Sequence, residues 1–434
     1  MNKANYRRYF QFLLVVLAAG AIFPIIYLRT NYQETILQVF NLTMPQLNNI
    51  YSVLGLVWVF GYFPSGILSD KFSAKKLLVI SLFFTAMGGF WFAQVPSYTS
   101  VVAIYCIWGF FSVFTFWSAH MKVVKMLAKS NEEGKFFGIL DGGRGVVEAV
   151  LASVAVLIFS SILGNSLELV DKHSAIVSVI YMYSIVLLAV SILIAIFVED
   201  DKKIAAKEQK VEVAATEKFK LSDIIKLFKN KFVYLHGGII FMGYAVYWTV
   251  YYLGGFLETN IGIDPVSVST IMVVVLWMRP VGGFVGGFLA DKIGKTTTIF
   301  GSILGASICL AITALLPVST AQAVFYAIIV LLAVFLYAIR GTYWSLLGEA
   351  KIDPLIMGTA IGAVSFVGYL PDIILPQFNS FLFNTFGGNG GYNAYFISSA
   401  LMGIVGVILV SIFGRLAKKE QLLKDKAQGN SISL

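Results

Sequence analysis

The sequence has few charged residues. Only 13% of its 434 residues are Asp, Glu, Lys or Arg, whereas an ordinary soluble domain has about 25%. Apolar residues make up 58% of the chain, and the mean hydropathy is +0.82. Because so many apolar residues must face something other than a finite protein core, the composition excludes a soluble enzyme and indicates a membrane protein with many spans.

Cysteine and histidine are also scarce. The chain has three histidines and two cysteines, Cys106 and Cys309, and both cysteines lie inside apolar runs. Neither a disulfide framework nor a cysteine-rich metal site is therefore available. The net charge of +9 comes from short basic runs between apolar stretches, whereas nucleic-acid binding requires a basic surface patch. We expect no metal, no cofactor and no nucleic acid, and a lipid bilayer as the surroundings.

Apolar runs long enough to cross a membrane recur along the whole chain. A spanning helix needs roughly 20 mostly apolar residues. Twelve such runs occur, at 9–30, 46–69, 77–97, 99–121, 136–161, 174–198, 232–257, 266–290, 297–316, 321–348, 355–383 and 391–414. We therefore predict an all-α membrane protein with twelve transmembrane helices.

The only long polar stretch, 199–231, divides these runs into six and six. Its Ala-Lys-Glu composition is typical of a solvated or membrane-surface helix. We predict a six-helix half over 1–198, a cytoplasmic linker over 199–231, and a second six-helix half with a short cytoplasmic tail over 232–434.

Basic residues give the orientation. Of the 32 Lys and Arg residues, 27 fall in the N-terminus, in the turns and linker after the even-numbered runs, and in the tail. By the positive-inside rule these segments are cytoplasmic. The sequence therefore predicts that both termini are cytoplasmic, and that the membrane is the inner membrane of a bacterium.

Two stretches of the same type follow the second and the eighth runs. The first is GILSDKFSAKK at residues 66–76 and the second is GFLADKIGK at residues 287–295, offset by 221 residues, or half the chain. Each has a leading glycine, then an aspartate followed by a lysine. A repeat at this spacing indicates two like halves related by duplication.

These two stretches resemble the signature of the major facilitator superfamily, Gly-x-x-x-Asp-(Arg/Lys)-x-Gly-(Arg/Lys)-(Arg/Lys). The second copy keeps the later glycine and base at Gly294 and Lys295, whereas the first copy has Ser73 and Ala74 there. The resemblance implies two pseudo-symmetric six-helix halves that transport a solute by alternating access. The aspartates and lysines of the motif would form a latch between the halves. The latch residues are Asp70, Lys71, Asp291 and Lys292.

A finer resemblance concerns the first and eleventh runs. Residues 6–8 (YRR) with 27–29 (YLR), and residues 357–360 (MGTA) leading to Gly368 and Tyr369, look like the organophosphate:phosphate antiporters and related organic-anion carriers. In that group one arginine of the first span and one of the seventh hold the substrate phosphate. Arg29 matches the first arginine. The seventh run departs from the pattern, because it has no arginine.

Seven charged residues lie inside predicted spans. They are Arg29, Asp141, Arg144, Glu148, Arg279, Arg340 and Asp372. Because a charge at the bilayer centre costs ~2.5–3.5 kcal/mol on insertion scales, each should be paired, face a water-filled cavity, or have a function. By the resemblance, the spans that carry them line the central cavity wholly or in part.

Helical spacing predicts pairing around Arg144. Asp141 and Glu148 stand at i−3 and i+4 from it, so both carboxylates can reach its guanidinium on one helical face. For Arg144 the sequence leaves a structural ion-pair network and substrate contact equally open. It favours a structural role for Arg279, and substrate contact for Arg29 and Arg340.

Four arginines against three acids leave a positive excess in the membrane. The planar fork of arginine suits carboxylate, sulfonate or phosphate groups, so we expect the substrate to be a small organic anion. Tyr247, Trp248 and Trp344 are candidates for contact with a ligand ring, although aromatic residues on membrane helices also serve as packing and interface anchors.

The energy source for transport is predicted from the absence of an ATP-binding motif. The sequence contains no Gly-x-x-x-x-Gly-Lys-(Ser/Thr) loop for ATP, so coupling to protons or to a counter-anion is favoured. A proton carrier must be a carboxylate that gains and loses its proton during the cycle. Glu148 is the leading candidate, followed by Asp372 and Asp141.

Two alternatives remain open from the sequence. One is a proton-coupled exporter of drugs or metabolites. It fits the aromatic content but gives no role to the four arginines within the spans. The other is a transport-like receptor that senses a solute, for which the short tail and linker offer little partner surface. We expect a monomeric transporter rather than an enzyme.

Overall fold

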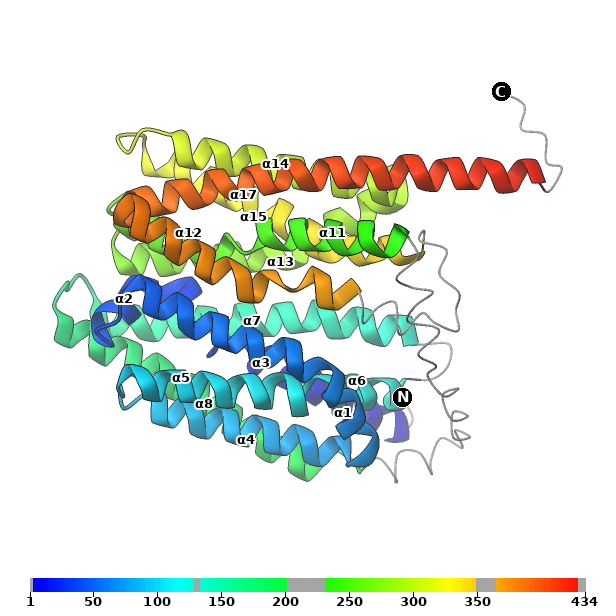
Figure 1. Cartoon of the computed structure of the whole chain (residues 1–434). Coiled ribbons are helices and arrows are strands. Elements are labelled where there is room, and N and C mark those ends of the chain that lie inside the picture. The colour runs from blue at the N-terminus through cyan, green and yellow to red at the C-terminus, as the bar shows by residue number, and fades with distance from the viewer. Residues whose placement is uncertain (1–2, 129–132, 201–230, 349–363, 428–434) are drawn as a thin grey trace. The chain divides into compact units, whose positions relative to one another are not determined.

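The structure is a computed structural model that describes residues 3–128, 133–200, 231–348 and 364–427 (Figure 1). Every regular element in these ranges is helical. The first half of the chain contains α1 (Lys3–Ala21), α2 (Arg29–Val39), α3 (Met44–Lys71), α4 (Ala74–Phe92), α5 (Tyr98–Gly109), the π-helical turn η1 (Phe110–Thr115), α6 (Trp117–Leu127), α7 (Glu133–Leu163) and α8 (Leu169–Phe197).

The second half of the chain is helical in the same way. It contains α11 (Lys231–Tyr247), α12 (Val250–Thr259), α13 (Pro265–Ile293), α14 (Lys295–Leu315), α15 (Gln322–Thr342), the 3₁₀ turn η2 (Tyr343–Gly348) and α17 (Pro371–Ala427). The long α17 is broken at Gly387, whose φ of +74° lies in the left-handed region that glycine tolerates. The break separates the eleventh predicted run from the twelfth.

Among the described residues, nine helical segments are long and apolar enough to cross a membrane. The last of these, Val364–Glu420, contains residues 364–383 of the eleventh predicted run and the whole of the twelfth. The helices α1 and α3 are not among these nine segments but overlap the first two predicted runs. Residues 355–363 of the eleventh run lie outside the described residues, as does the linker over 201–230.

The structure corrects the end of the first predicted run. We expected that run to end at residue 30, but α1 ends at Ala21 and, after a turn over residues 22–28, α2 continues to Val39. Hydropathy missed α2 because its polar residues are buried inside the protein rather than exposed to water. Those residues are Arg29, Thr30, Asn31, Gln33 and Thr35.

A capping box fixes the start of α3. The backbone N–H of Thr43 donates to Gln46 Oε1 at 2.8 Å, and the N–H of Gln46 donates to Thr43 Oγ1 at 3.4 Å. These two bonds satisfy donors that a helix end leaves open. They place Asn48 in the second turn of α3, where it faces the cluster described below.

The chain forms two compact units. Unit one comprises Met1–Thr216, Val250–Pro280 and Asp372–Tyr392, and unit two comprises Glu217–Thr249, Val281–Pro371 and Asn393–Leu434. Within unit one, α12 from the second half of the sequence packs against α2 from the first half. Unit one therefore combines segments from both sequence halves.

Candidate functional site

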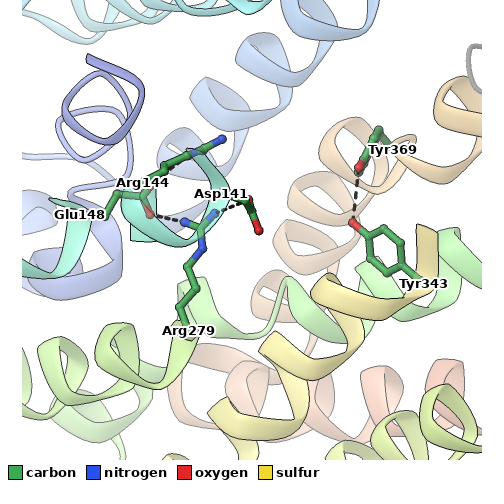
Figure 2. A network of polar contacts seen from close by, with 6 residues as sticks. All are labelled: Asp141, Arg144, Glu148, Arg279, Tyr343 and Tyr369. Carbon is green, nitrogen blue, oxygen red and sulfur yellow. Dashed lines mark hydrogen bonds and ion pairs between the residues drawn. The ribbon is translucent and has the colours of Figure 1, made fainter. Parts of the chain in front are cut away.

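An ion-pair cluster in unit one joins α7 to α13. Glu148 accepts a hydrogen bond from Arg144 Nε at 2.8 Å, and its second carboxylate oxygen pairs with Arg279 (Figure 2). Gly145 packs against the Arg279 side chain, since a Cβ at that position would lie 3.2 Å from Arg279 Cδ. One carboxylate is thus shared by two guanidinium groups, one from each half of the sequence.

The prediction for the neighbours of Arg144 was half right. The contact with Glu148 is confirmed, but the side chain of Asp141 is 80% exposed and lies 3.9 Å from Arg279 instead. The reason is the direction of the Arg144 side chain, whose guanidinium lies over the ring of Phe23 at 4.4 Å. The helical spacing allowed both contacts, but the side chain takes only one of them.

Arg29 is fully buried in unit one, where neutral groups surround it. Its guanidinium donates to Asn48 Oδ1 at 3.2 Å and to Gln33 Oε1 at 2.8 Å. It also lies over the rings of Tyr51 and Tyr252, at 4.8 and 4.2 Å from their centroids. Within the described part of the chain, no carboxylate lies within 4.0 Å of it. The sequence favoured substrate contact for Arg29, but in this conformation the Arg29 side chain has no solvent-exposed surface.

Arg340 occupies an aromatic cluster in unit two. Its guanidinium lies 5.0 Å from the ring centroid of Tyr244 and 4.8 Å from that of Tyr247. The two rings are nearly parallel, with their centroids 5.8 Å apart. Arg340 is half-buried, and none of the described carboxylates lies within 4.0 Å of it. Arg340 thus combines a membrane location, aromatic faces and no described counter-ion.

Further aromatic residues complete the surroundings of Arg340. The hydroxyl groups of Tyr343 and Tyr369 lie 3.4 Å apart (Figure 2), and Trp344 Nε1 donates to the Tyr369 hydroxyl at 3.1 Å. We call the set of Tyr244, Tyr247, Arg340, Tyr343, Trp344 and Tyr369 the Arg340 cluster. The sequence pointed to Tyr247 and Trp344 but missed Tyr369, whose only signal was its place in a motif of the eleventh run.

Two other predicted site residues are buried by packing. Trp248 is 1% exposed and so presents no surface to a ligand in this conformation. Asp372 is 3% exposed, in the first turn of α17. The backbone of Asp372 approaches Gly55 of α3 so closely that a Cβ at Gly55 would lie 2.5 Å from its carbonyl oxygen.

The predicted latch residues lie at helix ends. Lys71 is the last residue of α3 and is exposed. The side chain of Asp70 lies outside the described part of the structure. Asp291 and Lys292 are exposed near the end of α13, and Lys292 lies 5.9 Å from the ring of Phe288. The latch between the two motif copies stays a prediction.

Comparison with known proteins gives consistent results over nearly the whole chain. A sequence model of the Major Facilitator Superfamily matches residues 9–376. The chain is 27% identical over 425 residues to the inner membrane protein YqcE of Escherichia coli K12, covering 96% of this chain and 97% of the relative. It is also 27% identical over 207 residues to a cis,cis-muconate transport protein of Acinetobacter baylyi, covering 47% and 48% of the two chains.

Solved structures share the fold. A bacterial homologue of the human lysosomal transporter Spinster, in an inward-facing and unoccupied conformation, matches with a TM-score of 0.76 and 12% identity, over 95% of this chain and 98% of that chain. A D-xylose-proton symporter matches with a TM-score of 0.71 and 16% identity, over 93% and 97%.

Proposed function

This chain belongs to the Major Facilitator Superfamily, and we propose that it moves a small organic anion across the membrane by alternating access of its two halves. The fold is the family's twelve membrane-spanning helices in two halves, and the chain is a multi-pass integral membrane protein. We place the boundary between the halves in the linker over 199–231.

The observation that carries the anion proposal is the Arg340 cluster. A charge within a span costs ~2.5–3.5 kcal/mol on insertion scales, and aromatic faces return only part of this, about 0.5–2 kcal/mol. A bound anion would supply the missing countercharge, and the planar guanidinium would bind a carboxylate, sulfonate or phosphate through two hydrogen bonds. Arg340 is therefore the principal ligand in this proposal, with Tyr247 and Trp344 against the body of the substrate.

Two further observations support an anionic substrate. In the α7–α13 cluster, Arg144 and Arg279 share the buried carboxylate of Glu148, and the second acid, Asp141, is 80% exposed and 3.9 Å from Arg279. The buried part of the cluster therefore keeps a positive excess through which Arg144 would assist binding. In addition, one relative is named as a transport protein for cis,cis-muconate, which by its name is the anion of an organic acid.

The proposal predicts selective binding of anions by the wild-type protein. In a thermal-shift screen of carboxylate, sulfonate and phosphate compounds, at least one should raise the melting temperature. Arg340→Lys keeps the charge but loses the fork, so it should weaken that ligand about tenfold or more, since hydrogen bonds to charged groups contribute about 1.5–3 kcal/mol. Arg415→Lys, at an exposed position of α17, is the matched control and should bind normally.

The screen also separates the alternatives. If neutral sugars, nucleosides or organic cations stabilise the protein and anions do not, the anion proposal is wrong and the exporter reading replaces it. If anions bind but Arg340→Lys binds them as well as Arg415→Lys does, the substrate is anionic but its ligand is another residue.

We propose that transport is coupled to protons or to a counter-anion, with Glu148 as the leading proton carrier and Asp372 as the second. Two arginines hold Glu148 in this conformation, so adding a proton would remove the charge that both of them contact. Proton uptake at Glu148 would therefore accompany the separation of Arg279 from α7. Asp141, which is exposed, is a less suitable carrier.

The proposed orientation, with both termini in the cytoplasm, has a direct test. A cysteine placed at Ser166, between the fifth and sixth predicted spans, should react in intact cells with a membrane-impermeant maleimide, because the basic residues are on the other side. A cysteine at Lys210 in the linker should react only after the cells are permeabilised. The reverse pattern would overturn the orientation.

A further inference from the structure

The neutral surroundings of Arg29 extend into a polar cluster that crosses between the sequence halves. We call the set of Arg29, Gln33, Asn48, Tyr252, Asn379 and Tyr392 the Arg29 cluster. All six side chains belong to unit one, and each is at most 2% exposed. The first three come from α2 and α3, and the others come from α12 and α17.

Three hydrogen bonds of this cluster join the first half of the sequence to the second. The Tyr252 hydroxyl donates to Asn48 Oδ1 at 2.9 Å, and Asn48 Nδ2 donates to Asn379 Oδ1 at 3.2 Å. Gln33 Nε2 donates to the Tyr392 hydroxyl at 2.5 Å. Asn48 also accepts from Arg29, so it binds residues of both halves at once.

The cluster lies far from the basic motif of the same half. Asn48 is 23 residues before Lys71 on the single helix α3, which corresponds to ~35 Å along the helix axis. Because the positive-inside rule makes the Lys71 end cytoplasmic, the Arg29 cluster lies toward the outer side of the membrane. An alternating-access carrier must separate its halves on this side whenever it opens outward.

We propose that the Arg29 cluster is the lock that holds the outer ends of the two sequence halves together, and that Arg29 acts in this closure rather than in substrate binding. The proposal rests on alternating access and on the orientation above, but not on the class of substrate. It accounts for the burial of Arg29 and for partners that come from both halves.

Neutral groups contact the guanidinium of the lock directly, whereas the Glu34 carboxylate accepts from Tyr392 at 3.0 Å and from Gln33 at 3.4 Å instead. Among the residues that the structure describes, Arg29 Nε and Asn379 Nδ2 have no hydrogen-bond partner, and no carboxylate lies within 4.0 Å of the guanidinium. A buried cation that is contacted directly by neutral groups keeps part of its desolvation cost, whereas a carboxylate in direct contact would offset that cost. Supplying a carboxylate should therefore strengthen the closure.

Asn48→Asp supplies that carboxylate with little change of shape. The new oxygen can face Asn379, whose amide can turn so that Nδ2 donates and gains the partner that it lacks. A buried cysteine reports opening: Ser52→Cys lies one turn further along α3, in a Cys106→Ser, Cys309→Ala background. An impermeant maleimide applied from outside should label this cysteine about tenfold or more slowly in Asn48→Asp than in the parent, as expected for one added charged hydrogen bond.

Arg29→Met provides the opposite change. It keeps the length of the side chain and removes the charge with its donors, so labelling of the reporter should become about tenfold faster. Asn41→Asp, in an exposed turn, controls for added negative charge and should leave the rate unchanged. A cysteine at Ser166 controls for access of the reagent to the outer surface.

Unchanged reporter labelling in Asn48→Asp or in Arg29→Met would overturn the lock. If Asn48→Asp fails to fold, Arg29→Met and Tyr252→Phe, which removes one hydrogen bond between the halves but keeps the ring, still decide the question through faster or unchanged labelling. The assay needs no substrate, so an error in the proposed substrate class would appear in the binding screen and not here.

Discussion

Replacing Glu148 by alanine should lower the free energy of unfolding by about 3–5 kcal/mol and abolish transport. The carboxylate is shared by Arg144 and Arg279. Its removal takes the countercharge from Arg144 and leaves Arg279 with the exposed carboxylate of Asp141 at 3.9 Å, both within membrane-spanning helices. Breaking a buried ion pair by removing one partner has a cost of that size. The change in the free energy of unfolding is measured by denaturing the purified protein in detergent and monitoring the loss of its helical circular-dichroism signal.

Two variants test whether the effect comes from the shared charge. Glu420→Ala removes the partner of Lys231 at an exposed pair and should cost no more than about 1 kcal/mol. The double variant Glu148→Gln, Arg279→Gln keeps the net charge of the cluster, and the glutamine can still accept from Arg144. It should therefore cost clearly less than the sum of the two single changes. A Glu148→Ala protein as stable as Glu420→Ala would show that the cluster contributes no stability.

The same double variant separates stability from coupling. If Glu148 carries the proton, the variant should exchange substrate across vesicle membranes but fail to accumulate it against a gradient, because exchange does not require release of the proton. Normal uphill accumulation would move the proton-carrier proposal to Asp372, or away from protons altogether.

Replacing Gly55 by alanine should also have a large effect. A Cβ at this position would lie 2.5 Å from the carbonyl oxygen of Asp372 and 2.7 Å from its carbonyl carbon. These are backbone atoms, which cannot turn aside as a flexible side chain can, so α3 and α17 must move apart. We expect a loss of about 1–3 kcal/mol in stability, and a fall in transport, because this contact joins the two sequence halves inside unit one.

Gly301→Ala is the matched control for Gly55→Ala. Gly301 is an exposed glycine of α14, and a Cβ there would meet nothing within 4 Å. Alanine in the middle of a helix is favoured over glycine by roughly 0.5–1 kcal/mol, so this variant should be at least as stable as the wild type. Melting temperatures and substrate exchange for the two variants decide the matter. Equal behaviour would show that α3 and α17 tolerate the added methyl group.

Hydropathy predicted most of the fold because each span must bury roughly 20 residues in lipid. It failed at α2, where polar side chains such as Arg29 and Gln33 are buried against protein. A hydropathy window cannot distinguish burial in protein from exposure to water. The charged residues of the site could be identified from the sequence because each of them interrupts an apolar run.

The pairing of those charges was less predictable. Helical spacing placed Asp141 and Glu148 within reach of Arg144, but only the side-chain rotamer decides which contact forms. Arg279 is 131 residues from its partner Glu148, and no local pattern in the sequence joins them. The neutral members of the Arg29 cluster, such as Asn48 and Asn379, were missed because amides within apolar runs give no periodic signal.

The composition of unit one has a consequence for biosynthesis. Its segments end at Tyr392, so the unit can close only after about nine-tenths of the chain has been made. Arg279 follows Glu148 by 131 residues, and at 5–20 residues per second the ribosome needs on the order of ten seconds to deliver it. During that interval Arg144 is the partner already available to Glu148 on the same helix. In the nascent first half, Arg144 can therefore neutralise the Glu148 carboxylate within the bilayer before Arg279 has been synthesised.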